Sequence, residues 1–145
     1  MTTSDPRQLI VLCDGTNNTL TGGTHDTNLV KLLTQIRANA NDPNQIVFYD
    51  PGVGSTGSLP AVTVWDEIKK WNQRVMGLAF GGGIFENIAQ SYQFLMRNYK
   101  EGDHIYLFGF SRGAFTARCV AGLVNQFGLL QPQMEHMVPT LIQLY

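Results

Sequence analysis

The sequence predicts an α/β fold with a mostly parallel sheet, and three observations support this prediction. Short apolar runs rich in β-forming residues occupy residues 9–13, 46–49 and 105–110. Each run ends in a polar segment that contains glycine, and stretches with helical spacing of apolar side chains lie between and after the runs. Strands that alternate with helices indicate parallel pairing, because a parallel neighbour is reached only through a crossover connection.

The first strand and the first helix are predicted near the amino terminus. Residues 9–13 form a continuous apolar run, which is typical of a strand buried on both faces. The polar residues 14–18 follow it, at the end of a parallel strand where open α/β sheets bind ligands. Asp26 or Thr27 is the expected N-cap of a helix with the apolar face Leu29, Leu32, Leu33 and Ile36.

The second strand, residues 46–49, also runs into a polar, glycine-rich end. Residues 56–83 are poorly periodic, and we interpret them as an excursion over the same edge of the sheet with a short helix near residues 65–75. Residues 81–83 are three glycines that open a strong helix, which Gly102 ends. Its apolar positions are Ile84, Ile88, Tyr92, Leu95 and Tyr99.

The third strand leads into Ser111, which Gly109 and Gly113 flank. A helical pattern then runs to Gly128, and a further apolar-periodic segment covers residues 138–145. A strand, a Gly-x-Ser-x-Gly turn and a helix are together typical of a nucleophile elbow, in which the serine is strained. Side chains at the two glycines would collide with the neighbouring strand and helix. We therefore predict that Ser111 is a nucleophile and that the Arg112 N–H stabilises an oxyanion.

Composition excludes several classes of protein. The 145 residues are 43% hydrophobic with a formal net charge of −1, enough for a core and without a charge pattern that suggests a nucleic-acid partner. Cys13 and Cys119 lie among apolar residues and are predicted to be buried thiols. The polar amino terminus lacks a secretory core, and no apolar run reaches membrane-spanning length. We expect a protein that is cytoplasmic when made, and any export would proceed without a cleaved signal.

Two motifs have rival interpretations. Asp14-Gly15-Thr16 is half of the phosphatase signature Asp-x-Asp-Gly-Thr, but Leu12 occupies the position of the nucleophilic aspartate. Phosphoryl transfer is therefore excluded, and Asp14 is expected to fix the next loop by accepting backbone N–H bonds. The glycines at 81–83 would suit a phosphate, but no Gly-Lys-Ser/Thr follows, so close helix packing is favoured.

The remaining candidates also have structural explanations. A general base is one interpretation of His136, which is adjacent to Glu135, and of His25, in a loop near the same edge of the sheet, but a surface histidine is favoured for both. His104 is expected to be structural, at the far end of the third strand from the chemistry. The arginines at 112 and 118 are either solvated or paired with Asp50. A lipid-facing surface and a core are equally good interpretations for three large residues: Trp65, Trp71 and Met76.

Five motifs match one family in order and spacing: residues 12–18, 26–28, 49–54, 83–88 and 102–118. They read Leu-Cys-Asp-Gly-Thr-Asn-Asn, Asp-Thr-Asn, Tyr-Asp-Pro-Gly-Val-Gly, Gly-Ile-x-x-Asn-Ile and Gly-Asp-x-Ile-x-Leu-Phe-Gly-Phe-Ser-Arg-Gly-Ala-Phe-x-Ala-Arg. From residue 9 to about residue 130 the chain resembles the α/β-hydrolase domain of bacterial type VI secretion lipase effectors and their uncharacterised bacterial and fungal relatives. The resemblance implies a three-layer α/β-hydrolase-like fold and esterase chemistry on lipids, with phospholipase A activity in the effectors.

The resemblance also assigns site residues. Ser111 matches the family nucleophile, and Arg112 supplies one oxyanion N–H by its position. The loop after the first strand should supply the second, from Gly15 or Thr16, and two carboxylates line the rim of the site: Asp14 and Asp50. No metal or cofactor is expected.

The triad acid and histidine of such hydrolases lie after later strands. The residues after Ser111 contain Glu135 and His136 but no further clear strand. We therefore expect residues 1–145 to be the N-terminal portion of one hydrolase domain, with about three strands of a larger sheet.

The predicted function is that of a serine carboxylic-ester hydrolase, a lipase or phospholipase that acts on membrane lipids as a secreted antibacterial effector. Its partners would be a lipid or ester substrate and a membrane surface. The resemblance adds an immunity protein and a secretion-tip protein. The alternative is a non-catalytic hydrolase-like fragment or interaction module that needs a second chain to complete the sheet and triad, because unpaired strand edges recruit partners.

Overall fold

The computed structural model describes residues 6–15, 26–38, 42–52 and 83–145. Its elements alternate as the sequence predicts, which confirms the α/β class. The short helix expected near residues 65–75 lies outside the described residues, as do Trp65, Trp71 and Met76. In chain order the elements are β1 (Gln8–Cys13), α1 (Asn28–Ala38), β2 (Gln45–Asp50), α3 (Gly83–Asn98), β3 (His104–Gly109), α4 (Arg112–Phe127), a 3-10 helix η1 (Pro132–Met137) and α5 (Val138–Leu144).

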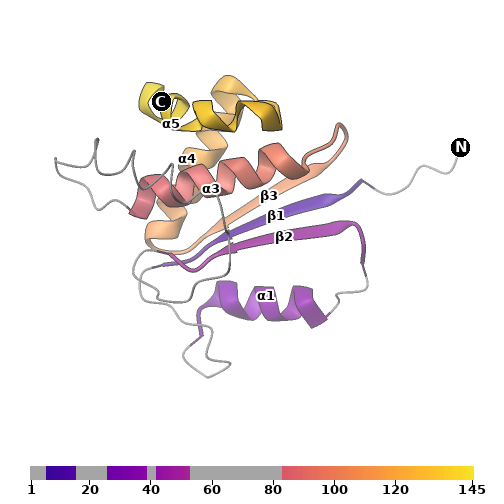
Figure 1. Ribbon diagram of the computed structural model, residues 1–145. Helices are drawn as coiled ribbons and strands as arrows, with labels where there is room; N and C mark the ends of the chain where they lie inside the picture. Colours follow the sequence, from indigo (N-terminus) through magenta and orange to yellow (C-terminus); the bar gives the residue numbers. More distant parts are fainter. Residues whose placement is uncertain (1–5, 16–25, 39–41, 53–82) are drawn as a thin grey trace, which may run out of the picture.

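The described strands form a parallel sheet in the order β2-β1-β3. The central strand β1 is buried along almost its whole length, which explains its uninterrupted apolar sequence. In register, Cys13 lies between Asp50 at the end of β2 and Gly109 at the end of β3. The residues that follow all three strands therefore meet at one edge of the sheet, the left-hand edge in Figure 1.

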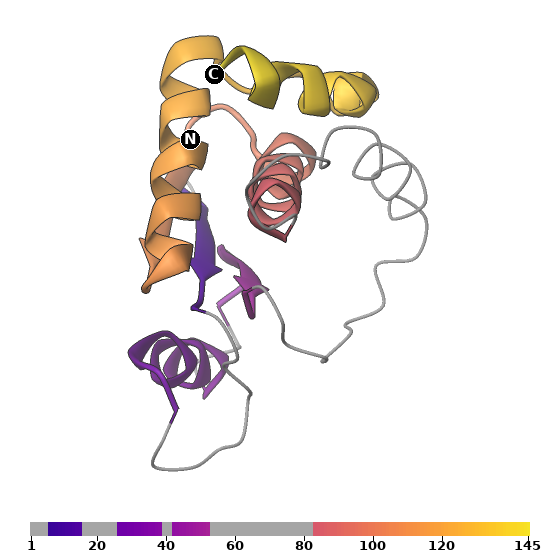
Figure 2. The same ribbon diagram turned by 90° about the vertical axis from the view of Figure 1, so that its left-hand side faces the viewer.

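Helices cover the sheet on both faces, so the described elements form three layers. Helices α3 and α4 lie side by side on one face and α1 lies on the other, as Figures 1 and 2 show. The larger core contains Leu9, Val11 and Cys13 of β1 with residues of α3, α4 and α5. The smaller core contains Ile10 and Leu12, which pack under α1. Successive residues of β1 thus serve opposite cores, as the pleat of a strand requires.

No described residue covers one face of β3. Tyr106 and Phe108 of β3 are in register with Ile10 and Leu12 and lie on the same face. Their side chains are 41% and 39% exposed, whereas those of Ile10 and Leu12 are 6% and 0% exposed. The helix α1 packs against residues of β1 and β2, and the core beneath it includes no described residue of β3.

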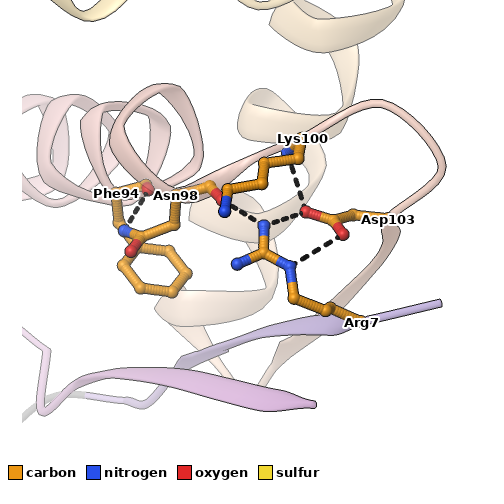
Figure 3. Close-up of polar contacts among 5 residues, drawn as sticks. All are labelled: Arg7, Phe94, Asn98, Lys100 and Asp103. Carbon is orange, nitrogen blue, oxygen red and sulfur yellow. Dashed lines mark hydrogen bonds and ion pairs between the residues drawn. The ribbon is translucent and has the colours of Figure 1, made fainter. Parts of the chain in front are cut away.

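Arg7 and Asp103 form an ion pair at the amino end of the sheet (Figure 3). Arg7 donates through Nε to Asp103 Oδ1 at 3.0 Å and through Nη2 to Asp103 Oδ2 at 2.5 Å. The same Nη2 donates to the carbonyl oxygen of Asn98 at 2.8 Å, and the Lys100 N–H donates to Asp103 Oδ2 at 2.7 Å. The start of β1 is thereby tied to the loop between α3 and β3.

Several details differ from the sequence-based predictions. The helix α3 ends at Asn98, so Tyr99 lies just beyond it and is exposed. Cys13 is buried, but Cys119 is only partly buried. The sequence analysis does not predict the 3-10 helix before α5, because its six residues are too few to show a helical period. Its Glu135 forms an ion pair with Arg97 in the last turn of α3.

Candidate functional site

The turn between β3 and α4, residues 109–113, has an unusual backbone. Ser111 has φ +54° and ψ −124°, and it is the one non-glycine residue with positive φ in the part of the chain that the structure describes. Such a conformation costs roughly 1–3 kcal/mol and persists only where the surrounding structure enforces it. Ser111 is exposed at the corner between strand and helix. We call residues 109–113 the Ser111 turn.

The two glycines of the Ser111 turn are required by its neighbours. A Cβ on Gly113 would lie 2.0 Å from the Cys13 carbonyl oxygen at the end of β1. A Cβ on Gly109 would lie 2.5 Å from Ala114 Cα in α4. Real Cβ atoms do not approach other atoms this closely, so the collisions expected from the sequence, one with a strand and one with a helix, are confirmed. The spacing of glycine and serine thus has a steric origin.

The N–H groups of the Ser111 turn are only partly used. Phe110 N–H donates to Cys13 O at 3.0 Å, Gly113 N–H donates to Phe110 O at 2.9 Å, and Ala114 N–H donates to Ser111 O at 3.0 Å. Within the described ranges the Arg112 N–H has no acceptor. It is the first N–H of a sixteen-residue helix, where the helix dipole favours negative charge. A donor is therefore available beside the Ser111 hydroxyl.

The carboxylate of Asp14 is buried directly after β1, with 1% of the residue exposed. Its Oδ1 accepts the Gly15 N–H at 2.7 Å. Its Oδ2 accepts the hydroxyls of Thr27 at 2.6 Å and Tyr49 at 2.9 Å. Thr27 Oγ1 also accepts the Val30 N–H at 3.2 Å, so Thr27 is the N-cap of α1, one of the two residues predicted for this role. Asp14 accepts a backbone N–H as expected, but it lies inside the edge of the sheet and not on an open surface.

Of the two residues predicted for the second oxyanion donor, Gly15 is described and Thr16 is not. The Gly15 N–H already donates to Asp14, and Gly15 itself is buried.

Asp50 ends β2 on the same edge and is 4% exposed. Its Oδ1 accepts the Gly52 N–H at 2.9 Å, whereas its buried Oδ2 has no hydrogen-bond partner among the described residues. Burial raises the pKa of Asp50 to about 6, partly opposed by the Gly52 N–H, and the charge of Asp14 adds to the rise. Burial likewise raises the pKa of the Cys13 thiol to about 12, which makes Cys13 an inert core residue and not a nucleophile.

The structure separates the other candidates from the Ser111 turn. Arg112 and Arg118 are exposed and form no ion pair within the described residues, so neither pairs with Asp50. His104 begins β3 at the opposite end of the strand from Ser111. His136 is exposed on η1. The adjacent Glu135 forms an ion pair with Arg97 of α3, near the amino end of the sheet. His25 lies outside the described residues.

Sequence reasoning missed the two hydroxyl partners of Asp14. Thr27 was assigned only as a helix cap and Tyr49 only as a strand residue. The one available signal was that both residues belong to motifs that also contain carboxylates, Asp26-Thr27 and Tyr49-Asp50.

Within the described ranges, no group of three or more histidine, cysteine or carboxylate side chains is arranged to hold a metal ion. No helix there is both long and apolar enough to cross a bilayer.

Comparison with known proteins places the chain in a family. Residues 7–145 match the family described as "T6SS, Phospholipase effector Tle1-like, catalytic domain". An uncharacterized protein of Saccharomyces cerevisiae is 38% identical over 138 residues, which is 94% of this chain and 20% of the yeast protein. The chain thus spans about a fifth of that relative's length, and no solved structure matches it significantly. The chain belongs to the family of Tle1-like phospholipase effector catalytic domains.

Proposed function

We propose that this chain carries the nucleophile of a serine ester hydrolase that cleaves lipid esters, with Ser111 as the attacking residue. The conformation of Ser111 supports the proposal most strongly: an exposed hydroxyl is held at φ +54° between a strand and a helix. Backbone strain of this kind is concentrated at functional sites, and a nucleophile elbow requires it. Membership of the phospholipase effector family supports a lipid as the substrate.

In the proposed reaction the Ser111 Oγ attacks the ester carbonyl carbon and forms a tetrahedral intermediate. Its oxyanion accepts the Arg112 N–H at the start of α4, and a second N–H from Thr16 completes the oxyanion hole. The alcohol then leaves with a proton, and water hydrolyses the acyl-enzyme to release the acid and restore Ser111.

A general base must take the proton from Ser111. The described histidines are poor candidates for this role, since His104 lies at the other end of β3 and His136 lies on η1. We propose that the base and its carboxylate partner come from another part of the full-length protein, because the chain spans 20% of its yeast relative. Residues 1–145 would then be the nucleophile-bearing portion of the domain.

The finer proposals concern where the enzyme acts and with which partners. A secreted antibacterial phospholipase A would meet a membrane surface, and an effector of this kind would have an immunity protein and a secretion-tip partner. Trp65, Trp71 and Met76, for which a core and a lipid-facing surface are equally good interpretations, are the candidates for contact with that membrane.

Fatty-acid release from phospholipid vesicles by the full-length protein tests the proposed function. We expect release by the wild type and a loss of about a thousandfold or more in Ser111→Ala, because the nucleophile is removed. Ser91→Ala is the matched control, because Ser91 is buried in α3 beside Cys13 and should leave turnover unchanged. Hydrolysis of a soluble short-chain ester but not of vesicles would keep the serine chemistry and contradict the lipid substrate. Equal turnover by wild type and Ser111→Ala would contradict both.

A second candidate function is a non-catalytic module completed by other polypeptide. Half-exposed Tyr106 and Phe108 on the uncovered face of β3 favour it, because parallel sheets are normally covered on both faces. A chain of residues 1–145 that forms a stable complex with the remainder of the full-length protein, without ester turnover in that complex, would support this candidate.

A further inference from the structure

Asp14 makes contacts that reach beyond its own strand. Among the described residues, its carboxylate accepts hydrogen bonds from Gly15, Thr27 and Tyr49, which come from the chain after β1, the cap of α1 and the end of β2. A buried carboxylate of this kind is stable only with several donors, and this one has donors from three separate segments. One side chain thus joins three elements at the carboxyl edge of the sheet.

The backbone beside that carboxylate supports the Ser111 turn. The Cys13 carbonyl oxygen accepts the Phe110 N–H and faces Gly113 so closely that no side chain fits between them. The carbonyl oxygen of Asp14 lies next, 2.6 Å from where a Gly113 Cβ would be. The Asp14 N–H is in turn held by the Asp50 carbonyl oxygen at 2.8 Å. The conformation of residues 13–15 therefore sets the position of the first turn of α4.

We infer that Asp14 is a positioning residue of the Ser111 site, whose carboxylate fixes residues 13–15 and through them the Ser111 turn. The inference rests on the proposed function of Ser111. Asp14 does not touch the substrate and transfers no proton. It acts because catalysis is sensitive to displacements of about 1 Å in the attacking group and the oxyanion donors. The chain that leaves Gly15 is also where the second oxyanion donor is proposed.

Tyr49 is a lasting hydrogen-bond donor to Asp14. Burial and the hydrogen bond to Asp14 raise the pKa of Tyr49 well above its usual range, so its hydroxyl stays protonated and remains a donor. Asp14→Asn keeps the shape of the side chain and an acceptor for Gly15, but it replaces the charged acceptor of both hydroxyls by an amide nitrogen. Asp14→Ala removes all three bonds. The two variants therefore form a graded pair.

The test is the rate at which a fluorophosphonate labels Ser111 in the full-length protein, together with kcat and KM for a soluble short-chain ester. We expect Asp14→Ala to lower the labelling rate and kcat by about a hundredfold and Asp14→Asn by about tenfold, with KM unchanged, since positioning acts on the attack and not on binding. Tyr49→Phe, which removes one bond, should give a smaller loss. Asp103→Asn is the control, because it removes a hydrogen-bonded, partly buried carboxylate from the opposite end of the sheet.

The outcomes separate the inference from the proposed function. A wild-type protein that is not labelled would overturn the proposed function and this inference with it. Labelling and kcat in the Asp14 variants equal to those of the wild type would overturn the inference alone, as would an equal loss in Asp103→Asn, which would show a general effect of stability. If Asp14→Ala does not fold, the rates of Asp14→Asn and Tyr49→Phe decide, and wild-type values in both would overturn it.

Discussion

The two ends of the described sheet differ in backbone strain and in the hydrogen bonding of one carboxylate at each end, Asp103 and Asp50. At the amino end, both carboxylate oxygens of Asp103 accept hydrogen bonds from Arg7, and the nearby turn at Gly102 has open space around it. At the carboxyl end, Ser111 is strained and Asp50 has a buried oxygen without a hydrogen-bond partner among the described residues. Two described glycines at that end are also packed tightly: a Cβ on Gly113 would lie 2.0 Å from Cys13 O, and a Cβ on Gly52 would lie 2.3 Å from Gly15 O.

The difference indicates that the amino end serves stability and that the carboxyl end is under a functional constraint. An end that serves only stability can satisfy all its polar groups, because nothing else constrains them. Strain and an unsatisfied buried acceptor lower stability, so their occurrence together at one edge points to a functional constraint there. The carboxyl edge is also where α/β sheets place their sites.

Replacing one glycine at each end should give the largest contrast. Gly113→Ala would bring Cβ to 2.0 Å from Cys13 O, so we expect a loss of about 4 kcal/mol or more in the free energy of unfolding, or no folding. A Cβ at Gly102 would have no atom within 4 Å, and the only cost of Gly102→Ala is the backbone strain of a φ of +92°. We therefore expect a loss of about 1–2 kcal/mol in the free energy of unfolding. Urea denaturation measures both. Equal losses would remove the contrast in packing.

Asp50→Asn should stabilise the protein at neutral pH. The folded pKa of Asp50, about 6, lies above its ordinary value of 3.8, so the buried carboxylate disfavours folding above pH 6 and this penalty disappears as pH falls toward 3.8. The expected gain at pH 7–8 is at most about 3 kcal/mol. The new amide N–H groups also lose hydration, which keeps the gain below this limit.

Urea denaturation from pH 4 to 8 checks this prediction. The difference between Asp50→Asn and wild type should be greatest above pH 6 and should vanish below 3.8. A difference that is independent of pH would show that the Asp50 carboxylate is not the source of the penalty.

Ser111→Gly should raise the free energy of unfolding by about 1 kcal/mol, because glycine adopts positive φ without strain. Ser111→Ala removes the same hydroxyl but keeps the strain, so it should not show this gain. A comparison of the two thermal midpoints isolates the backbone term. A Ser111→Gly midpoint no higher than that of Ser111→Ala would contradict the strain.

Asp103→Asn should have the smallest effect, because Arg7 is partly exposed and ion pairs in contact with water contribute little. The Arg7 guanidinium lowers the pKa of Asp103, so the pair stabilises the fold above the ordinary aspartate pKa and this contribution is lost as pH falls through the lowered value. The thermal midpoint of the variant should therefore lie below that of wild type at pH 7 and approach it in acid. A gap that persists in acid would assign the effect to packing.

Local patterns made the elements and the Ser111 turn predictable from the sequence. The apolar run of β1 and the period of α3 act over a few residues, and Gly109 and Gly113 act on atoms within the turn or on the adjacent strand. These features depend on sequence neighbours and on the fixed geometry of a strand–turn–helix unit. The α/β class followed from them.

Contacts between distant residues were not predictable in the same way. Arg7 and Asp103 are 96 residues apart, and Asp14 and Tyr49 are 35 residues apart. Predicting these two contacts requires the strand order β2-β1-β3, which cannot be deduced from the spacing of apolar residues. The burial of Asp50 is also a tertiary property, because a polar residue at a strand end is expected at the surface.

The central claim, that Ser111 is an activated nucleophile, is tested most directly by the intact mass of the full-length protein after a fluorophosphonate probe. We expect a single adduct that maps to the peptide containing Ser111, disappears in Ser111→Ala and remains in Ser91→Ala. A folded protein that gains no adduct, or an adduct that persists in Ser111→Ala, would contradict the claim.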